Sequence, residues 1–209
     1  MEKIRHYFPE LTEEQLHQLH HLGNLYKTWN QKINVISRKD IEQVYDHHIL
    51  HALAIARFVQ FEPGAEILDL GTGGGLPGIP LGIFFPQTQF YLIDGTRKKI
   101  TVVQEIVREL ALTNIQAQQQ RAEEWKGQKF DFVVCRAVAS LDKLVTWSFP
   151  LIKQKQQHVV PNGLITLKGG NLKDEIKALG TGHFVDVEEI STFFDDPYFG
   201  EKYIVYVQH

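Results

Sequence analysis

Apolar residues recur at helical spacing through the first part of the chain. Between residues 12 and 32 they fall three or four positions apart, which predicts an amphipathic helix. Thr12 starts a capping-box pattern that places the beginning of this helix. A second helical stretch covers 41–61, with Asp40 in position to cap it. Residues 1–61 are therefore predicted to form a helical subdomain.

Short apolar runs alternate with helical stretches after residue 61. This alternation predicts a mostly parallel sheet with helices on both faces. Residues 62–209 are interpreted as one domain, packed with the helical subdomain as a single unit. The last two apolar runs have no helix between them and are predicted to pair as an antiparallel hairpin. The predicted strands are 66–70, 89–94, 115–119, 130–135, 163–168, 184–190 and 202–207. The helices predicted between them are 77–84, 97–112, 140–152 and 171–179.

The composition is typical of a globular protein of the cytoplasm. Hydrophobic residues make up 43% and charged residues 22% of the 209 positions. Cys135 is the single cysteine, so no internal disulfide can form. No apolar run is long enough to cross a bilayer, and the first residues lack the apolar core of a signal peptide. A cytoplasmic location without a membrane partner is expected.

The net charge of −3 limits the kind of nucleic-acid contact that is possible. A general nucleic-acid binder usually carries a basic excess. An RNA partner would have to be met by a local basic patch, because neutralisation of phosphates drives that affinity. The candidate patches are 97–99 (Arg-Lys-Lys) and 153–155 (Lys-Gln-Lys). DNA is not expected as a partner.

Glycine is concentrated at one point of the predicted sheet. Five of the eight residues 71–78 are glycine, directly after the predicted strand 66–70. Because glycine costs conformational entropy, such a run indicates a ligand that lies close to the main chain. In open parallel sheets, ligands bind beyond the carboxyl ends of the strands. Aspartates stand at two of these ends, as Asp69 and Asp94.

Two ligands fit this arrangement. The segment 73–78 matches G-x-G-x-x-G, and with Asp94 it gives a dinucleotide fingerprint of low specificity. The segment 69–75, Asp-Leu-Gly-Thr-Gly-Gly-Gly, resembles motif I of the class I S-adenosylmethionine methyltransferases. An acid at the end of the second strand suits a ribose, since a carboxylate can accept two hydrogen bonds from a diol. We favour S-adenosylmethionine as the cofactor.

Other motifs along the chain carry a closer resemblance. They are Trp29-Asn30, Asn34-Val-Ile-Ser37, His48-Ile-Leu50, 69–81, Leu92-Ile-Asp94, Arg121-Ala-Glu-Glu124, Arg136-Ala-Val-Ala-Ser-Leu141 and Leu167-Lys-Gly169. In this order they resemble the RsmG family, also called glucose-inhibited division protein B or GidB. That family methylates N7 of a guanosine in 16S ribosomal RNA. The resemblance extends from about residue 12 to the last predicted strand.

The resemblance implies a fold, a cofactor and a partner. The fold is a Rossmann-like α/β sheet of seven mostly parallel strands, the last one antiparallel, with an N-terminal helical extension. The cofactor is S-adenosyl-L-methionine. The partner is 16S ribosomal RNA, either naked or in the small ribosomal subunit, and the protein would act as a monomer.

The resemblance also implies roles for particular residues. Those expected to contact the cofactor are Asp69, Gly71, Gly73, Gly75, Leu76, Asp94, Ala122, Glu123 and Arg136. Those expected on the catalytic and substrate side are Arg136, Asn34, Lys168 and His48. The chain departs from the family pattern in having His51-Ala52 for Asp-Ser, Gly95 for Ser, and Lys202 for Arg.

Methylation at guanine N7 asks little of the protein. N7 has a lone pair and no proton, so alignment and exclusion of water can suffice without a strong base. The sequence lacks the Asn-Pro-Pro-Tyr motif of exocyclic-amine methyltransferases, and Cys135 follows valine rather than the proline used in C5-pyrimidine methylation. The target base would stack on an aromatic side chain. The candidates are Tyr26, Trp29, Trp147 and Phe149.

Other functions remain open from the sequence. The chain could be a methyltransferase of the same fold that acts on a small molecule or a protein, a nucleotide-binding module without activity, or a dehydrogenase. The pairs 17/21 and 47/51 are histidines at i, i+4, a spacing that can share a metal. No cysteine or Glu-x-x pattern accompanies either pair, and no metal is expected.

Overall fold

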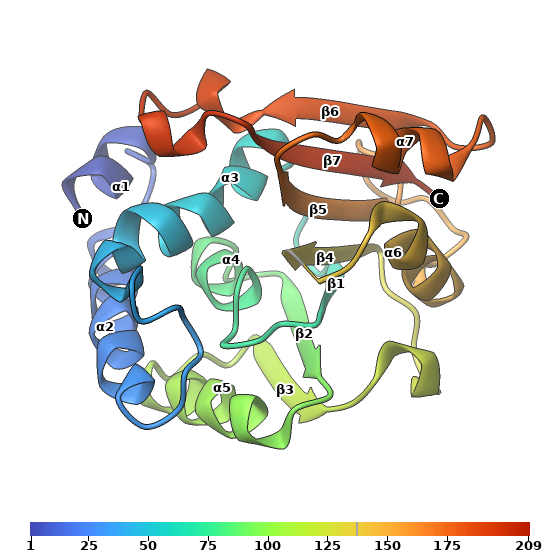
Figure 1. Ribbon diagram of the computed structural model, residues 1–209. Helices are drawn as coiled ribbons and strands as arrows, with labels where there is room; N and C mark the ends of the chain where they lie inside the picture. Colours follow the sequence, from blue (N-terminus) through green and yellow to red (C-terminus); the bar gives the residue numbers. More distant parts are fainter. Residues whose placement is uncertain (137) are drawn as a thin grey trace.

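One seven-stranded sheet organises the molecule (Figure 1). The computed structural model describes residues 1–136 and 138–209. The strand order is β3-β2-β1-β4-β5-β7-β6, and β7 alone runs antiparallel to its neighbours. The strands are β1 (Glu66–Leu70), β2 (Gln89–Asp94), β3 (Ile115–Gln119), β4 (Phe132–Arg136), β5 (Gly163–Gly169), β6 (Val185–Glu189) and β7 (Lys202–Gln208).

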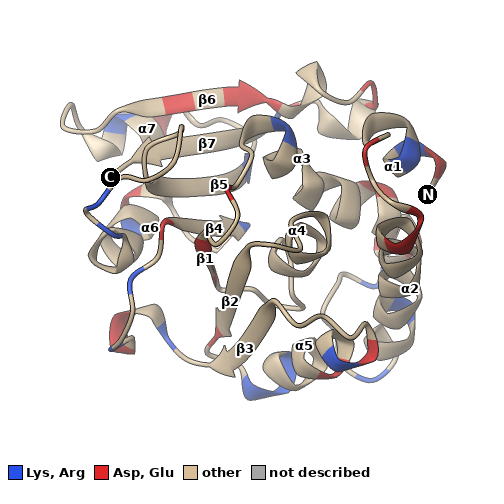
Figure 2. Cartoon of the chain, turned by 180° about the vertical axis from the view of Figure 1, so that it is seen from behind, with Lys and Arg blue, Asp and Glu red and all other residues tan. Residues whose placement is uncertain are grey.

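This sheet confirms the predicted fold class. Each predicted strand is present with its ends within two residues of the prediction. The predicted hairpin of the last two strands is also present, although β7 lies inside the sheet, between β5 and β6. The edge strand β6 carries Asp186, Glu188 and Glu189, which mark that edge as acidic (Figure 2). Charged side chains on an edge strand discourage pairing with another chain.

Helices cover both faces of the sheet, as the alternating pattern predicts. On one face α3, α4 and α5 pack with the sheet, and α1 and α2 join the same cluster of buried side chains. On the other face α6 and α7 contribute to a second cluster. The α-helices are α1 (Glu2–Tyr7), α2 (Glu13–Asn30), α3 (His51–Phe58), α4 (Gly78–Phe84), α5 (Arg97–Glu109), α6 (Leu141–Ser148) and α7 (Lys173–Leu179).

The predicted capping box starts α2. Thr12 Oγ1 accepts a hydrogen bond from the Gln15 backbone at 3.2 Å, and Gln15 Oε1 accepts one from the Thr12 backbone at 2.9 Å. The side-chain nitrogen of Gln15, Nε2, also donates to the carbonyls of Ile83 and Phe84, at 2.9 and 3.1 Å. Those carbonyls belong to the end of α4, where the helix leaves them unpaired. Gln15 therefore both starts α2 and anchors it to the end of α4.

The single helix predicted over 41–61 is wrong in detail. A 3-10 turn (Ile41–Gln43) and a π-helix (Val44–Leu50) precede α3, which ends at Phe58. Asp40 stands in the N-cap position but makes no side-chain cap bond. Its carboxylate instead contacts His47 and His48. The polar contacts of Asp40 thus replace a regular helix start, and π-turns of this kind are frequent at functional sites.

The N-terminal helices share their core with the sheet. One cluster of buried side chains includes Ile4 and Phe8 of the N-terminal region, Leu53 of α3, and Ile67 and Ile204 of the sheet. The division of the chain at residue 61 stays a prediction. In the described parts of the chain, no helix is long and apolar enough to cross a membrane.

Candidate functional site

The glycine run forms the turn from β1 into α4. Gly71, Gly73 and Gly75 have φ angles of +69°, +59° and +96°, which other residues adopt only with strain. A Cβ added at Gly73 would meet no atom within 4 Å, so the backbone there is open to a ligand. The glycines therefore serve the turn itself and leave main chain exposed at the carboxyl end of β1.

Asp69 lies beneath this loop. Its side chain is fully buried, and its Oδ2 accepts hydrogen bonds from Thr72 Oγ1 at 2.6 Å and from the Gly78 backbone at 2.8 Å. Within the described chain Oδ1 has no partner. Burial raises the pKa of Asp69 to about 7, although these hydrogen bonds oppose the shift. Asp69 thus holds the loop in place, and its predicted contact with the cofactor stays a prediction.

Asp94 ends β2, next to the end of β1. Its Oδ2 accepts a hydrogen bond from the Gly73 backbone at 3.0 Å, and its Oδ1 accepts one from Thr96 at 2.7 Å. Lys99 Nζ lies 4.0 Å from Oδ2. Parallel pairing of β1 with β2 places Leu70 opposite Ile93, so the two strand ends meet at one edge. The carboxylate is fixed by main chain, and each oxygen keeps lone pairs for a further donor.

A hollow of about 220 Å³ opens beside Asp94. Four of the predicted cofactor residues line it: Gly71, Asp94, Ala122 and Glu123. Trp147 from α6 lines it as well. The hollow therefore combines a carboxylate, open glycine backbone and an aromatic ring. Its remaining lining residues are Leu70, Ile93, Gly95, Gln120 and Arg121.

The other predicted cofactor residues do not line this hollow. Gly73 bonds to Asp94, and Gly75 approaches Tyr26, whose hydroxyl would lie 3.4 Å from a Cβ added at Gly75. Leu76 is buried in the core. Arg136 extends into a different hollow. Contacts of these residues with a cofactor stay predictions.

A second hollow, of about 380 Å³, lies at the ends of β4 and β5. It brings together His48, Arg136 and Lys168, three of the four residues predicted for the substrate side. Arg136 Nη1 lies 3.1 Å from His48 Nδ1. His51, Tyr198 and the start of β7 complete the polar part of the lining. Residues more than a hundred positions apart therefore form one polar surface.

Asp40 fixes the orientation of His48. Asp40 Oδ2 lies 2.6 Å from His48 Nε2, and Asp40 Oδ1 lies 2.6 Å from His47 Nδ1. Burial opposes it, but the hydrogen bonds from both histidines hold the pKa of Asp40 below its ordinary value. A carboxylate only accepts, so Nε2 of His48 carries the proton, and Nδ1 accepts from Arg136. Burial, followed by the charge of Arg136, lowers the pKa of His48 to about 4, in agreement with a neutral ring.

Lys168 is already engaged within the protein. Its Nζ donates to the Ala139 carbonyl and to Glu175 Oε2, each at 2.6 Å. The same oxygen of Glu175 accepts from the Leu141 backbone at 2.8 Å. Lys168 therefore joins the end of β5 to α7 and to the start of α6. Ala137, in the predicted motif 136–141, lies outside the described residues.

Asn34 lies beside the glycine loop and not in the second hollow. Its segment is tied down by Asn30, whose side chain bonds to the backbone of Val35 and Ile36 at 2.8 to 2.9 Å. A Cβ added at Gly74 would lie 2.9 Å from Val35, so this segment packs on the loop. Asn34 itself is exposed. Its role toward the substrate stays a prediction.

Sequence reasoning missed Asp40 and Tyr198 as parts of the site. The ring of Tyr198 stacks on His47 with centroids 3.6 Å apart and an interplanar angle of 5°. An aspartate at a predicted helix start indicates an N-cap, and nothing in the sequence around Asp40 indicated a further contact with histidine. Of the aromatic candidates, Tyr26 is fully buried and cannot meet a base, whereas Trp147 lines the first hollow.

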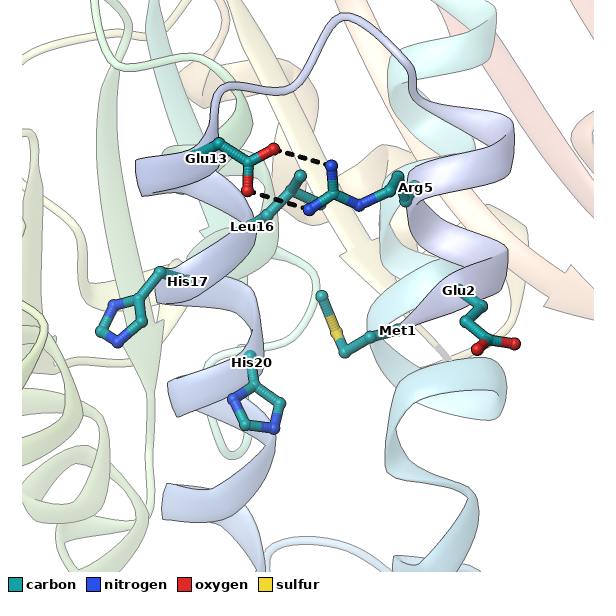
Figure 3. A pocket seen from close by; sticks show the side chains of 7 residues that line it. All are labelled: Met1, Glu2, Arg5, Glu13, Leu16, His17 and His20. Atoms are coloured by element: carbon teal, nitrogen blue, oxygen red, sulfur yellow. Dashed lines mark hydrogen bonds and ion pairs between the residues drawn. The ribbon is translucent and has the colours of Figure 1, made fainter.

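The histidine pairs do not gather metal ligands. Among the residues that the structure describes, no group of three or more histidine, cysteine or carboxylate side chains could hold a metal ion. His17 belongs instead to a surface hollow between α1 and α2 (Figure 3). There Arg5 binds both oxygens of Glu13, at 2.7 and 2.9 Å. This hollow contains none of the predicted site residues.

A comparison with known protein families shows which family the chain belongs to. The model of the GidB family, described as rRNA small subunit methyltransferase G, matches residues 15–194. The chain belongs to the GidB family. The predicted resemblance is thereby confirmed, and with it the assignment as a methyltransferase.

Relatives in the GidB family match the chain over its length. The ribosomal RNA small subunit methyltransferase G of Flavobacterium johnsoniae is 50% identical over 207 residues, which cover 99% of this chain and 97% of that protein. The protein of the same name from Bacteroides thetaiotaomicron is 50% identical over 208 residues, which cover all of both chains.

Solved structures place this GidB member among the class I methyltransferases by fold. An S-adenosylmethionine-dependent methyltransferase from Aquifex aeolicus aligns with a TM-score of 0.58 at 16% identity, covering 82% of this chain and 98% of that chain. A precorrin-6y C5,15-methyltransferase from Geobacter metallireducens aligns with a TM-score of 0.57 at 11% identity, covering 85% and 92%. At these identities the likeness concerns the fold alone.

The residues of the first hollow fit S-adenosylmethionine, the cofactor of the GidB methyltransferases. Asp94 offers lone pairs to two hydroxyl groups of a ribose. Gly71 would allow main chain against the ligand, and Ala122 and Trp147 supply apolar surface for an adenine. A dinucleotide would need the helix N-terminus after 73–78 free, but Asp69 already accepts from the Gly78 backbone.

Proposed function

We propose that the chain methylates N7 of a guanosine in the 16S ribosomal RNA of the small subunit. Support comes from relatives that carry the name rRNA small subunit methyltransferase G and match the chain from end to end. The observation that carries the proposal is the pair of hollows at the ends of neighbouring strands. We assign the hollow beside Asp94 to the cofactor and the hollow beside Arg136 to the RNA.

The side chains at the site suit a reaction without proton transfer. S-adenosylmethionine, when bound, supplies an electrophilic methyl group to which the N7 lone pair can bond directly. His48 donates from Nε2 to Asp40 and accepts at Nδ1 from Arg136, so neither ring nitrogen is free to act as a base. Arg136 remains protonated under ordinary conditions. These residues would orient the substrate, and Trp147 would help to exclude water from the cofactor.

The basic surface that meets the RNA is proposed to begin at α5. Arg97 and Lys98 are exposed at its first turn, directly after β2 and hence at the same edge as both hollows. In the second candidate patch, Lys153 pairs with Glu66 at 2.8 Å and Asp131 at 3.0 Å. Its charge is therefore already compensated. We further propose that the protein acts as a monomer in the cytoplasm.

The direct test is transfer of a labelled methyl group. Small-subunit particles and naked 16S RNA, both from cells that lack this protein, are incubated with the chain and labelled S-adenosylmethionine. Cleavage with aniline then reports N7-methylguanosine. A single labelled guanosine is expected, and the preferred substrate form reveals the stage of assembly. Cofactor binding without label in either RNA would move the function to a small-molecule or protein substrate.

A further inference from the structure

The second hollow holds more positive charge than its surroundings neutralise. None of its eight lining residues is acidic. Lys168 pairs with Glu175, but neither Arg136 nor Lys202 forms an ion pair with a carboxylate of the described chain. Burial lowers the pKa of Arg136, so its charge is held in a poorly solvated place. The carboxylates of Asp69 and Asp40 favour this charge from a distance, but neither forms an ion pair with Arg136. A buried cation without a paired carboxylate gains from an anionic partner.

Within the described part of the chain, Lys202 and His51 also lack a polar partner that an anion in this hollow could provide. Lys202 begins β7 opposite Gly169, the end of β5, and its Nζ lies 4.3 Å from the centre of the Tyr198 ring. His51 is 7% exposed, and its Nε2 has no hydrogen-bond partner among the described residues. A buried, unpartnered ring nitrogen beside two cations that lack a carboxylate partner in the described chain is a lining that suits an anion.

We propose that this hollow binds a phosphate of the RNA backbone next to the target guanosine. Arg136 and Lys202 would supply the charge, and His51 would supply a further polar contact. The inference rests on the proposed function and names the part of the RNA that this hollow receives. A phosphate suits an arginine and a lysine together, because the guanidinium gives planar contacts and the ammonium gives a point charge.

The target base itself fits this hollow less well. An arginine that recognises guanine does so through O6 and N7 together. N7 must stay free, because it is the atom that receives the methyl group. A contact of Arg136 with phosphate leaves the base edge open. The other source of an anionic oxygen is the carboxylate of the cofactor, and binding measurements separate the two.

The test compares Lys202→Gln with Lys129→Gln. Lys129 is exposed and precedes β4, at the end of the sheet away from both hollows. The dissociation constant for 16S RNA is measured between 50 and 200 mM salt, about the range in which phosphate contacts weaken strongly. Cofactor affinity and N7 methylation are measured on the same samples. Lys202→Gln is expected to reduce the slope of log K against log salt by about one and to leave cofactor affinity unchanged.

Two further variants and outcomes make the inference decidable. Lys202→Arg keeps the charge and should keep the wild-type slope, while Lys129→Gln should match the wild type throughout. Melting temperatures identify any variant that has lost its fold. If Lys202→Gln has done so, Lys202→Met, which also lacks the charge but keeps an unbranched apolar stem, replaces it. An unchanged RNA slope in the charge-free variant would overturn the inference. If cofactor binding is weakened at the same time, the hollow receives the cofactor carboxylate instead. If the wild type forms no N7-methylguanosine, the proposed function fails first, and the inference falls with it.

Discussion

Two aspartates at strand ends differ because of their surroundings. Asp69 is fully buried and bonds to Thr72 and Gly78 of its own loop. Asp94 stands at the opening of the first hollow, where main-chain donors hold it and lone pairs remain available. One acid therefore shapes the loop, while the other is placed to meet a ligand.

Removal of the Asp94 carboxylate should weaken cofactor binding. Hydrogen bonds to a charged group contribute about 1.5–3 kcal/mol each, so the loss of one such bond in Asp94→Ala should raise the dissociation constant of S-adenosylmethionine about ten- to a hundred-fold, and the loss of both should raise it further. Calorimetric titration measures this constant. Glu62→Ala removes an exposed carboxylate before β1, at the opposite end of the sheet, and should change nothing. Equal affinity of Asp94→Ala and the wild type would contradict the ribose role.

The neutral His48 should make stability depend on pH. Burial and the charge of Arg136 lower its pKa from 6.5 to about 4, despite the hydrogen bond to Asp40. The unfolded chain then takes up a proton first as pH falls from about 6.5 to 4, so the folded state loses stability in that window, by on the order of 3 kcal/mol. His48→Gln lacks this titration.

Urea unfolding at pH 7 and pH 4.5 measures the difference. The free energy of unfolding should fall more steeply with acid in the wild type than in His48→Gln. Asp69 is present in both proteins, so its raised pKa contributes to both measurements. The same decrease in both proteins would mean that the histidine titrates normally.

At the scale of elements, the loop between β1 and α4 packs so closely on the side chains beneath it that position 78 has no room for a Cβ. A Cβ at position 78 would lie 2.6 Å from Asp69 Oδ2 and 2.8 Å from Leu92. Position 182 has nothing within 4 Å of such a Cβ. Replacement by alanine therefore meets a filled site at Gly78 and open space at Gly182.

Gly78→Ala should destabilise the fold. Overpacking of a filled core costs about 1–3 kcal/mol, and the loss of the Asp69 contact adds to it. Thermal unfolding of Gly78→Ala and Gly182→Ala measures the effect, with Gly182→Ala expected close to the wild type. A Gly78→Ala variant as stable as its control would show that the loop can shift away from Asp69.

Regular elements were predictable because their signals are local. The strands follow from apolar runs, and the start of α2 from the side chains of Thr12 and Gln15. The interruption of the 41–61 helix coincides with the contact of Asp40 with His48, which a periodic pattern does not contain. Lys168 is similar, because its partner Glu175 lies on a helix whose position only the fold determines. The motifs indicated the site residues, and tertiary contacts decided which of them face a hollow.

At the scale of the whole molecule, the N-terminal helices are bound into the main core. Phe8 is fully buried, with its ring centre 5.4 Å from that of Phe84 and 5.9 Å from that of Phe194. Phe84 ends α4, and Phe194 precedes β7. Three distant parts of the chain thus meet at one aromatic cluster.

Phe8→Ala should destabilise the entire chain in a single transition. Truncation of a buried phenylalanine costs about 3–5 kcal/mol, which lowers the melting temperature by roughly 10 °C in a chain of this size. Scanning calorimetry measures both the shift and the number of transitions. Phe184→Ala, at a side chain 61% exposed, should have little effect. A separate early transition would mean that the N-terminal helices unfold as an independent unit.

The position of β7 between β5 and β6 affects the order in which the protein can be completed during translation. A ribosome makes β5 and β6 before β7. Until residue 208 has emerged, β5 can pair only with β4, and β6 has no strand to pair with. A nascent chain therefore exposes an unpaired edge on β5 and lacks Lys202 from its second hollow. A stop codon after residue 200 would leave the cofactor half of the site encoded but the sheet open, and such a product is expected to aggregate and not to bind RNA.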